Sequence, residues 1–268
     1  MSGIVPAVSM MCPQEQVSSS KALRVCHVLP GPADSSNMIF AKNQILALAE
    51  AGVECRSVFL QSRTSPVVLV REVTRLRREL AQFHPDLIHA HYGTVTAAVC
   101  ALSSRFPLVI TYRGSDLNPG PGLFSLRSAV GRLLSQCAAL RASRMMCVST
   151  QLKNRLWWKK RFVAVVPGGV DLQRFRPMAK AAARLRMGWK SKEKVVIFNA
   201  GFDATRKRLD LAEAAIGMAR RWCDDIRLEV LDGSETQEQI PFYLNAADCL
   251  LMTSDWEGSP NMVKEAIA

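Results

Sequence analysis

The chain has 268 residues and a formal net charge of +12, with 49% hydrophobic and 22% charged residues. This composition is that of a globular protein with one large or two ordinary domains. No apolar run reaches the roughly 18 residues that a membrane-spanning helix needs. The first twenty residues lack the basic start and apolar core of a signal peptide, so we expect residues 1–20 to be a disordered tail.

Short apolar runs alternate with longer amphipathic stretches along the rest of the chain. The runs predict strands at 24–29, 53–60, 87–90, 108–112, 145–149, 163–166, 195–199, 226–231 and 249–253. The stretches between them predict helices at 39–51, 67–83, 94–104, 125–142, 150–158, 209–221, 237–246 and 261–268. Alternation of this kind indicates an α/β fold with parallel sheets covered by helices.

The segment PGGVDLQRFRP, residues 167–177, has turn chemistry without a helix or strand period, which is typical of a hinge. We therefore predict two domains, 21–172 and 173–268. The second domain shows only three strand signals, whereas a doubly wound domain carries about five or six strands. We expect this second domain to be incomplete.

All of the excess positive charge lies in the first part of the chain. Residues 1–170 contain 20 Lys and Arg against 8 Asp and Glu, and residues 171–268 contain 15 of each. The stretch KNRLWWKKR, residues 153–161, joins five cations to two tryptophans, a combination that suits a membrane interface. The alternative is a solvated basic surface. No nucleic-acid recognition signature accompanies the charge, so we expect an anionic membrane rather than nucleic acid as its partner.

Cysteine and histidine patterns bear on redox state, metals and location. None of the eight cysteines forms a C-x-x-C pair, which favours free thiols in the reducing cytoplasm. His89 and His91 form a pair without a second cluster, so no metal site is predicted. The sequence contains neither a G-x-G-x-x-G fingerprint nor a P-loop, so no nucleotide cofactor is indicated.

The stretch EGSPNMVKEAIA, residues 257–268, is the strongest candidate for a site. It follows the predicted strand 249–253, and Pro260 suits the first turn of a helix. The carboxyl edge of a parallel sheet is where open α/β folds bind ligands, and a helix N-terminus attracts phosphate. Glu257 and Glu265 could accept hydrogen bonds from sugar hydroxyls, so a sugar nucleotide is suggested. The alternative is a capped surface helix.

A second candidate is the basic run Arg206-Lys207-Arg208, at the start of the helix that follows strand 195–199. Cations at a helix start oppose the helix dipole, and a diphosphate would compensate for them. A solvated charge cluster is the alternative.

These segments resemble the retaining GT-B glycosyltransferases of glycosyltransferase family 4. EGSPNMVKE, residues 257–265, resembles the E-x7-E motif of that family. Five further segments resemble family segments in the same order: LIHAHYG (87–93), ITYRGSDL (110–117), VVPGGVDLQRFRP (165–177), RKRLDLAEAA (206–215) and YLNAADCLLMTSDW (243–256). The resemblance implies two Rossmann-like domains and no metal or other cofactor.

The resemblance also implies roles for individual residues. Glu257 would contact the donor sugar and Lys207, with Arg206, would neutralise the leaving diphosphate, so Glu257 and Lys207 are the candidate catalytic residues. The other donor-binding residues would be Glu265, at the ribose, and Asn261, Met262 and Val263 through their backbone. The acceptor side would be lined by His91, Arg113, Gly114 and Asp116.

The implied function is transfer of a sugar from a nucleotide-diphosphate sugar to a glycan or lipid-linked acceptor, with retention, in bacterial exopolysaccharide or cell-envelope glycan synthesis. The protein would act in the cytoplasm or at the inner face of the membrane. The alternative is a truncated, inactive remnant whose basic half binds a membrane or a partner.

Three departures from the family pattern stand out. Gly201 occupies the place of an arginine that often contacts the diphosphate, and Arg113 stands where a histidine is usual. Family members also continue beyond the position where this chain ends, so we expect a fragment. The apolar residues Met262, Val263, Ala266 and Ile267 would then lack part of their cover.

Overall fold

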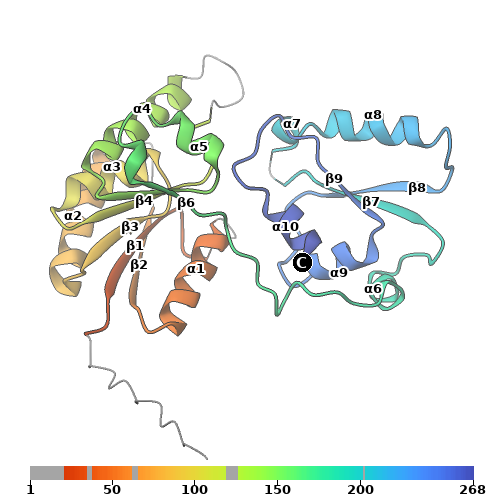
Figure 1. Ribbon diagram of the computed structural model, residues 1–268, viewed down its shortest axis with the longest axis horizontal. Coiled ribbons are helices and arrows are strands. Elements are labelled where there is room, and N and C mark those ends of the chain that lie inside the picture. The colour runs from red at the N-terminus through yellow and green to blue at the C-terminus, as the bar shows by residue number, and fades with distance from the viewer. Residues whose placement is uncertain (1–20, 35–37, 62–65, 119–125, 202) are drawn as a thin grey trace, which may run out of the picture.

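The computed structural model describes residues 21–34, 38–61, 66–118, 126–201 and 203–268, and the predicted tail 1–20 lies outside them. The described chain forms two parallel sheets that lie side by side and are joined by a long connection without regular structure, residues 166–179 (Figure 1). Among the described residues, no helix is both long and apolar enough to cross a membrane.

The first sheet has six strands in the order β2-β1-β3-β4-β5-β6, and every pair is parallel. These strands are β1 (Arg24–Pro30), β2 (Glu54–Leu60), β3 (Leu87–Ala90), β4 (Leu108–Tyr112), β5 (Arg144–Cys147) and β6 (Val163–Val165). The strand order reverses between β1 and β3, which makes their carboxyl ends the switch point of this sheet.

Helices cover both faces of the first sheet. They are α1 (Ile39–Glu50), α2 (Pro66–Phe83), α3 (Thr94–Ser103), α4 (Leu126–Arg141), α5 (Thr150–Arg155) and the single-turn η1 (Lys160–Phe162). Helix α3 packs against both α2 and α4, and α1 lies across the sheet from them (Figure 1). The largest hydrophobic core lies beneath α2, α3 and α4, and a smaller one, formed by Leu29, Ala41 and Ile45, lies beneath α1.

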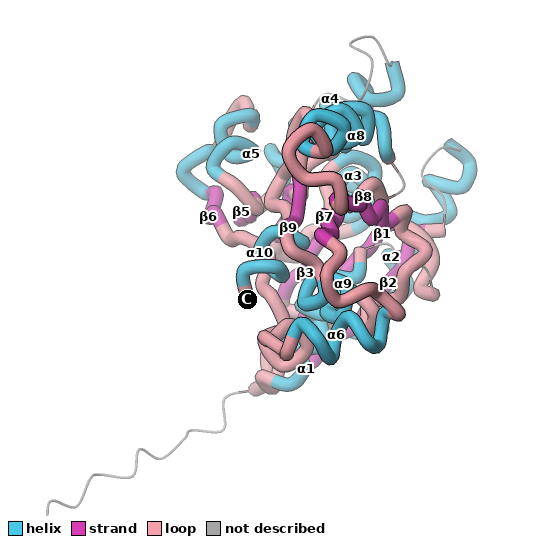
Figure 2. The backbone as a smooth tube through the Cα atoms, turned by 90° about the vertical axis from the view of Figure 1, so that its right-hand side faces the viewer, coloured by secondary structure: helices cyan, strands magenta, loops and turns pink. Residues whose placement is uncertain are grey.

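The second sheet has three parallel strands in the order β8-β7-β9. Its strands are β7 (Lys194–Asn199), β8 (Ile226–Leu231) and β9 (Cys249–Leu251), and its helices are α6 (Lys180–Met187), α7 (Ala204–Lys207), α8 (Leu209–Ala219), α9 (Ile240–Ala246) and α10 (Asn261–Ile267). Helix α8 lies on one side of the sheet, and α6 and α9 pack together on the other (Figure 2). A separate hydrophobic core fills each side.

The nine strands of the described residues agree with the sequence prediction to within two residues at each end, but two helical predictions and one prediction of exposure were wrong. Helix α6 was missed; buried Arg184 fixes it by donating to Ala246 O and by pairing with Asp248 across the fold. Helix α5 ends at Arg155 instead of Trp158, because Leu156 is extended and Lys159 is left-handed. Met262 packs into the second core instead of lacking cover, whereas Ile267 is exposed.

The structure describes seven of the eight cysteines. All seven are free; Cys26, Cys100 and Cys147 are buried, whereas Cys137 and Cys249 are exposed. The reducing compartment stays a prediction. Burial raises the pKa of the Cys26 and Cys147 thiols to about 12, so both behave as small apolar side chains.

Candidate functional site

The carboxyl ends of both sheets border one pocket with a volume of about 320 Å³, which lies within the range of small-molecule sites. The first sheet and its loops contribute Arg113, after β4, and Val148, after β5, while α1 contributes Phe40. The second half contributes the ends of β7 and β9, Lys207 of α7, the loop 254–260 and the start of α10. The pocket is therefore assembled from segments that are far apart in the sequence.

Helix α7 is short, and side chains hold both of its ends. The carboxylate of Asp203 accepts from the backbone N–H of Arg206 and caps the N-terminus. The hydroxyl of Thr253, which follows β9, lies 2.9 Å from Lys207 O and 2.8 Å from Arg208 O at the C-terminus. These bonds fix α7 to the loop after β9, because β7 and β9 are adjacent and end at the same edge.

Lys207 and Glu257 meet directly in the pocket. The Lys207 ammonium Nζ lies 2.5 Å from Glu257 Oε1, and Arg206 Nη1 lies 3.5 Å from the same oxygen. Burial raises the pKa of the Glu257 carboxyl, but the hydrogen bond from Lys207 and the two nearby cations outweigh it, so this pKa lies below its usual value. Glu257 is therefore ionised at neutral pH, with Lys207 as its counter-ion.

Arg206 lies behind this pair rather than in the pocket wall. Its guanidinium pairs with Asp203, donates to Trp256 O at 3.2 Å and stacks on the Trp256 ring at 4.9 Å. Arg206 thus adds positive charge to the site while its geometry is fixed by the surrounding loop. This arrangement fits the expectation that Arg206 supports Lys207.

Helix α10 closes the pocket from the second half. Asn261, Met262, Val263 and Glu265 all line it, and burial raises the pKa of the Glu265 carboxyl. Lys264 of the same helix donates from Nζ to Gly168 O at 2.7 Å, which links α10 to the connection between the sheets. The N-terminal turn of α10 therefore faces the pocket and is attached to the hinge segment.

The loop before α10 touches the first half of the molecule at Gly258. A Cβ atom added to Gly258 would lie 2.0 Å from Arg113 O, a distance that no side chain could occupy without moving the backbone. Gly114 lies on the other side of this contact, next to Gly258 and Trp256. Glycine at position 258 therefore permits the close approach of the two halves.

Arg113 reaches from this contact toward the first sheet. Its Nη2 atom lies 3.2 Å from Gln44 Oε1 of α1 and 3.2 Å from His91 Nδ1. Burial lowers the pKa of the guanidinium, and the charge of Asp116 partly offsets this effect. Since an arginine side chain keeps its proton in proteins, the pocket wall carries a partly buried positive charge at this point.

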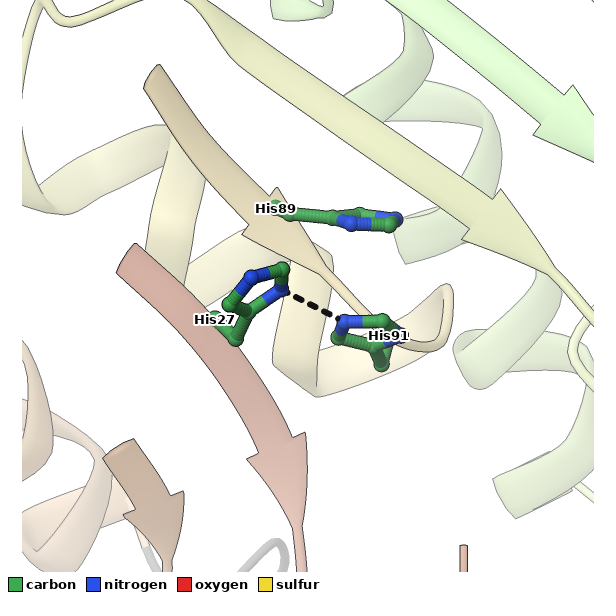
Figure 3. A group of neighbouring side chains, drawn as sticks. All are labelled: His27, His89 and His91. Atoms are coloured by element: carbon green, nitrogen blue, oxygen red, sulfur yellow. Dashed lines mark hydrogen bonds between the residues drawn. The ribbon is translucent and has the colours of Figure 1, made fainter. Parts of the chain in front are cut away.

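His91 belongs to a buried stack of three histidines at the switch point of the first sheet (Figure 3). His27 comes from β1, His89 from β3 and His91 from just after β3, and His27 lies opposite His89 in the strand register. His27 Nδ1 lies 2.9 Å from His91 Nε2, and His89 Nε2 lies 2.7 Å from the hydroxyl of Thr111. The prediction that His89 and His91 form an isolated pair was therefore wrong, because β1 supplies a third imidazole.

The hydrogen bonds define which nitrogens of the stack carry protons. A guanidinium can only donate, so His91 Nδ1 accepts from Arg113 and a neutral His91 carries its proton on Nε2. His91 then donates to His27 Nδ1, which places the proton of His27 on Nε2. The three rings could offer nitrogen ligands to a metal, but the adjacent guanidinium opposes a divalent cation. We interpret the stack as a hydrogen-bonded support for Arg113, and the absence of a metal remains a prediction.

Asp116 organises the backbone around the same corner. Its fully buried carboxylate accepts backbone N–H bonds from Gly93, Arg113 and Gly114 at 2.8 to 3.1 Å. It thus joins the loop after β3 to the loop after β4. Asp116 does not line the pocket, so the structure gives it a positioning role instead of direct contact with a ligand.

The structure therefore gathers most of the predicted site residues and separates a few. Seven of the predicted residues line the pocket: Arg113, Lys207, Glu257, Asn261, Met262, Val263 and Glu265. The other four lie directly behind it: His91, Gly114, Asp116 and Arg206. Sequence reasoning missed Phe40, Gln44 and His27. Only the buried register of β1 against β3 brings His27 to the site, and no local motif marks the other two.

Comparison with known proteins agrees with this architecture. Residues 26–174, more than half of the chain, match the family model of Glycosyltransferase Family 4. A curated relative is TuaC of Bacillus subtilis (strain 168), named as a glycosyltransferase of teichuronic acid biosynthesis, which is 29% identical over 209 residues. The alignment covers 69% of this chain and 51% of TuaC, so the chain spans about half the length of this relative.

Solved structures show the same fold at low sequence identity. Sucrose-phosphate synthase from Thermosynechococcus elongatus superposes with a TM-score of 0.68 at 15% identity, covering 91% of this chain and 79% of that chain. Anabaena HepE, solved in complex with UDP and glucose, gives 0.60 at 15% identity and covers 91% and 78%. The fold is that of the GT-B glycosyltransferases. Taken together with the matched family model, these findings show that the chain belongs to glycosyltransferase family 4.

Proposed function

We propose that this chain is a glycosyltransferase that takes a sugar from a nucleotide-diphosphate sugar and transfers it, with retention, to a glycan or lipid-linked acceptor. The observation that carries the proposal is the pocket between the two sheets. In this member of glycosyltransferase family 4, the pocket brings together Lys207 of helix α7, Glu257 of the loop before α10 and Glu265 of helix α10.

Each of these residues has a role that its geometry supports. Lys207 and Arg206 provide the positive charge that a departing diphosphate needs, and Glu257 already binds that charge in the absence of a ligand. A bound diphosphate would compete with Glu257 for Lys207 and release the carboxylate toward the sugar. Glu265, with a raised pKa in the wall near the helix start, would hydrogen-bond the ribose. This chemistry requires no metal.

Uridine is the base that we propose first, and a bacterial cell-envelope glycan is the proposed acceptor. Support comes from HepE, which was solved with UDP and with UDP-glucose, and from TuaC, named for teichuronic acid biosynthesis. Retention is proposed from the likeness of residues 257–265 to the E-x7-E motif. The anomeric configuration of the product, read by nuclear magnetic resonance, would test it.

We also propose that the protein works at an anionic membrane surface, where a lipid-linked acceptor would be found. Trp157 is 62% exposed next to the cations Lys159 and Lys160, while Trp158 turns inward and donates to Gln136 O. The segment thus presents an aromatic ring and positive charge together, as membrane-interface segments do.

Thermal unfolding of the 268-residue chain with millimolar UDP, GDP or ADP tests the donor site. A ligand present at a hundred times its dissociation constant adds about 2.7 kcal/mol to the free energy of unfolding. We expect one nucleotide to raise the midpoint temperature of unfolding, and we expect Lys207→Met to abolish this rise. Lys192→Met, at an exposed lysine before β7, is the matched control and should leave the rise unchanged.

Glu257→Gln should act in the opposite direction on binding. It removes the carboxylate that competes for Lys207, so nucleotide affinity should stay equal or increase while sugar transfer is lost. If no nucleotide shifts the midpoint, or if Lys207→Met binds as tightly as the unchanged chain, the proposed donor site is wrong.

A further inference from the structure

Arg113 is a partly buried cation that has no anionic side-chain partner among the described residues. Two cations line the pocket; Lys207 pairs with Glu257, but no carboxylate of the described residues forms an ion pair with Arg113. Its side-chain hydrogen-bond partners among the described residues, Gln44 and His91, are both neutral, and its Nε atom is buried without a hydrogen-bond acceptor among these residues. The guanidinium is thus held in place but not neutralised.

The nearest acid does not fill this gap. The Asp116 carboxylate is occupied by the backbone N–H groups of Gly93, Arg113 and Gly114, and burial raises its pKa. Burial lowers the pKa of Lys264, the charge of Glu265 partly offsets this effect, and the charge of Arg113 lowers the pKa further. The Lys264 ammonium donates to Gly168 O, so Lys264 is a cation near Arg113 and offers it no counter-charge.

A buried charge is costly unless a counter-charge accompanies it. Where the protein provides none, a ligand can provide it, and a planar guanidinium fits a carboxylate through two parallel N–H bonds. The diphosphate of a nucleotide sugar would already be bound at Lys207 and Arg206. Arg113 lines the same pocket from the opposite sheet, so the sugar attached to the diphosphate would lie between these two positive regions.

We propose that Arg113 binds the carboxylate of an acidic sugar, so that the pocket selects a uronic-acid donor over a neutral hexose donor. The proposal rests on the proposed function, and it moves Arg113 from the acceptor side to the donor sugar. The departure from the usual histidine at this position agrees with it, because an imidazole that is neutral suits a hydroxyl, whereas arginine suits an anion.

The test compares two donors that carry the same base and differ only in whether the sugar bears a carboxylate. The base is the one found by the thermal-unfolding screen; for uridine the two donors are UDP-glucose and UDP-glucuronic acid. Isothermal titration should show the full chain binding the acidic donor about tenfold more tightly or better, since hydrogen bonds to charged groups are the strong ones. In Arg113→Gln and Arg113→His the ratio of the two donor affinities should fall to about one. Both variants should keep their affinity for UDP itself, which also shows that they are folded.

Arg105→Gln is the matched control, because it removes the same charge from an exposed position outside the pocket and should keep the preference. Equal binding of both donors, or a preference that survives in Arg113→Gln, overturns the proposal. So does an equal loss for UDP and for both donors, which would place Arg113 at the diphosphate. In all three results the unchanged chain still binds the nucleotide, whereas failure of the proposed function shows as no nucleotide binding by the unchanged chain.

Discussion

Arg113 is held by a chain of hydrogen bonds that begins inside the first sheet. His27 accepts from His91, and His91 accepts from Arg113, so the orientation of the guanidinium depends on neutral imidazoles two strands away. Protonation of His91 would remove the acceptor that Arg113 uses. The stack therefore has to stay neutral for the pocket wall to keep its geometry.

The stack makes stability depend on pH in a defined direction. Burial lowers the pKa of His27 to about 4 and that of His89 to about 3, from an ordinary 6.5. Below pH 6.5 these histidines bind protons in the unfolded chain but stay neutral in the folded chain. The free energy of unfolding therefore falls as the pH drops from about 6.5 toward 4. For His27 alone the loss amounts to about 3 kcal/mol by pH 4, from 1.36 kcal/mol per pKa unit.

We expect His27→Asn to flatten this dependence by about one proton, measured by urea unfolding between pH 7 and pH 4.5. His84→Asn is the matched control, because His84 is exposed and its side chain lies outside the stack. A His27→Asn profile as steep as that of the unchanged chain would show that His27 does not stay neutral in the folded state.

Several site residues could be predicted from the sequence because their function depends on local order. Lys207 follows a strand that ends at the sheet edge, and Glu257 follows the neighbouring strand, so parallel pairing alone brings them together. His27 could not be predicted in this way. It lies inside an apolar strand, and only the pairing of β1 with β3 reveals its neighbours.

At the scale of elements, the site depends on where loops and helix starts touch. Gly93 directly precedes helix α3, and its backbone N–H donates to the Asp116 carboxylate. The N–H of Thr94, the first residue of α3, donates to Ser135 Oγ of α4 at 2.7 Å. An added Cβ at Gly93 would lie 2.5 Å from the same Ser135 oxygen and 2.9 Å from the Tyr112 ring. The close packing of α3, α4 and the loop after β4 therefore requires glycine here.

Gly93→Ala should lower the free energy of unfolding by about 1–3 kcal/mol, the usual effect of overpacking. Gly217→Ala is the control within helix α8, where an added Cβ meets nothing within 4 Å. A helical alanine there should raise the free energy of unfolding by about 0.5–1 kcal/mol. Urea unfolding of both variants decides the matter, and equal effects of the two would contradict the packing argument.

At the scale of the whole molecule, the excess positive charge gathers on the first half, next to exposed apolar side chains of helix α4. Residues 117–170 contain nine Lys and Arg and no Asp or Glu. Along α4, exposed apolar side chains recur at helical spacing at Leu126, Val130, Leu133 and Leu140. Lys159 donates to Leu140 O and Ala142 O, so the segment with Trp157 lies against the end of this helix. The combined surface suits an anionic membrane.

We expect the protein to bind vesicles of phosphatidylglycerol but not of phosphatidylcholine, and to lose this binding as salt screens the charges. Trp157→Ala should weaken vesicle binding in a sedimentation assay by about tenfold, since interfacial tryptophans anchor by their rings. Trp222→Ala is the control, because Trp222 is 80% exposed but lies in the second half. Equal losses in the two variants would rule out this surface as the contact.

The sequence by itself determined the two parallel sheets, the strands of each and the order of the donor-site segments. Apolar runs, turn residues and motif spacing are local properties, so they can be recognised along the chain without knowledge of the fold. The domain boundary at residue 172 stays a prediction, although the irregular connection 166–179 surrounds it.

Only the tertiary structure decided the environment of each charge. It placed His27 against His91, the residue that bonds Arg113, and gave Asp116 three backbone donors. It left Arg113 without a counter-ion among the described residues and brought Gly258 against Arg113 O. These features join residues from separate strands and from both sheets. Burial and pairing depend on which segments meet in space, and a charge acquires its chemistry from those neighbours rather than from its neighbours along the chain.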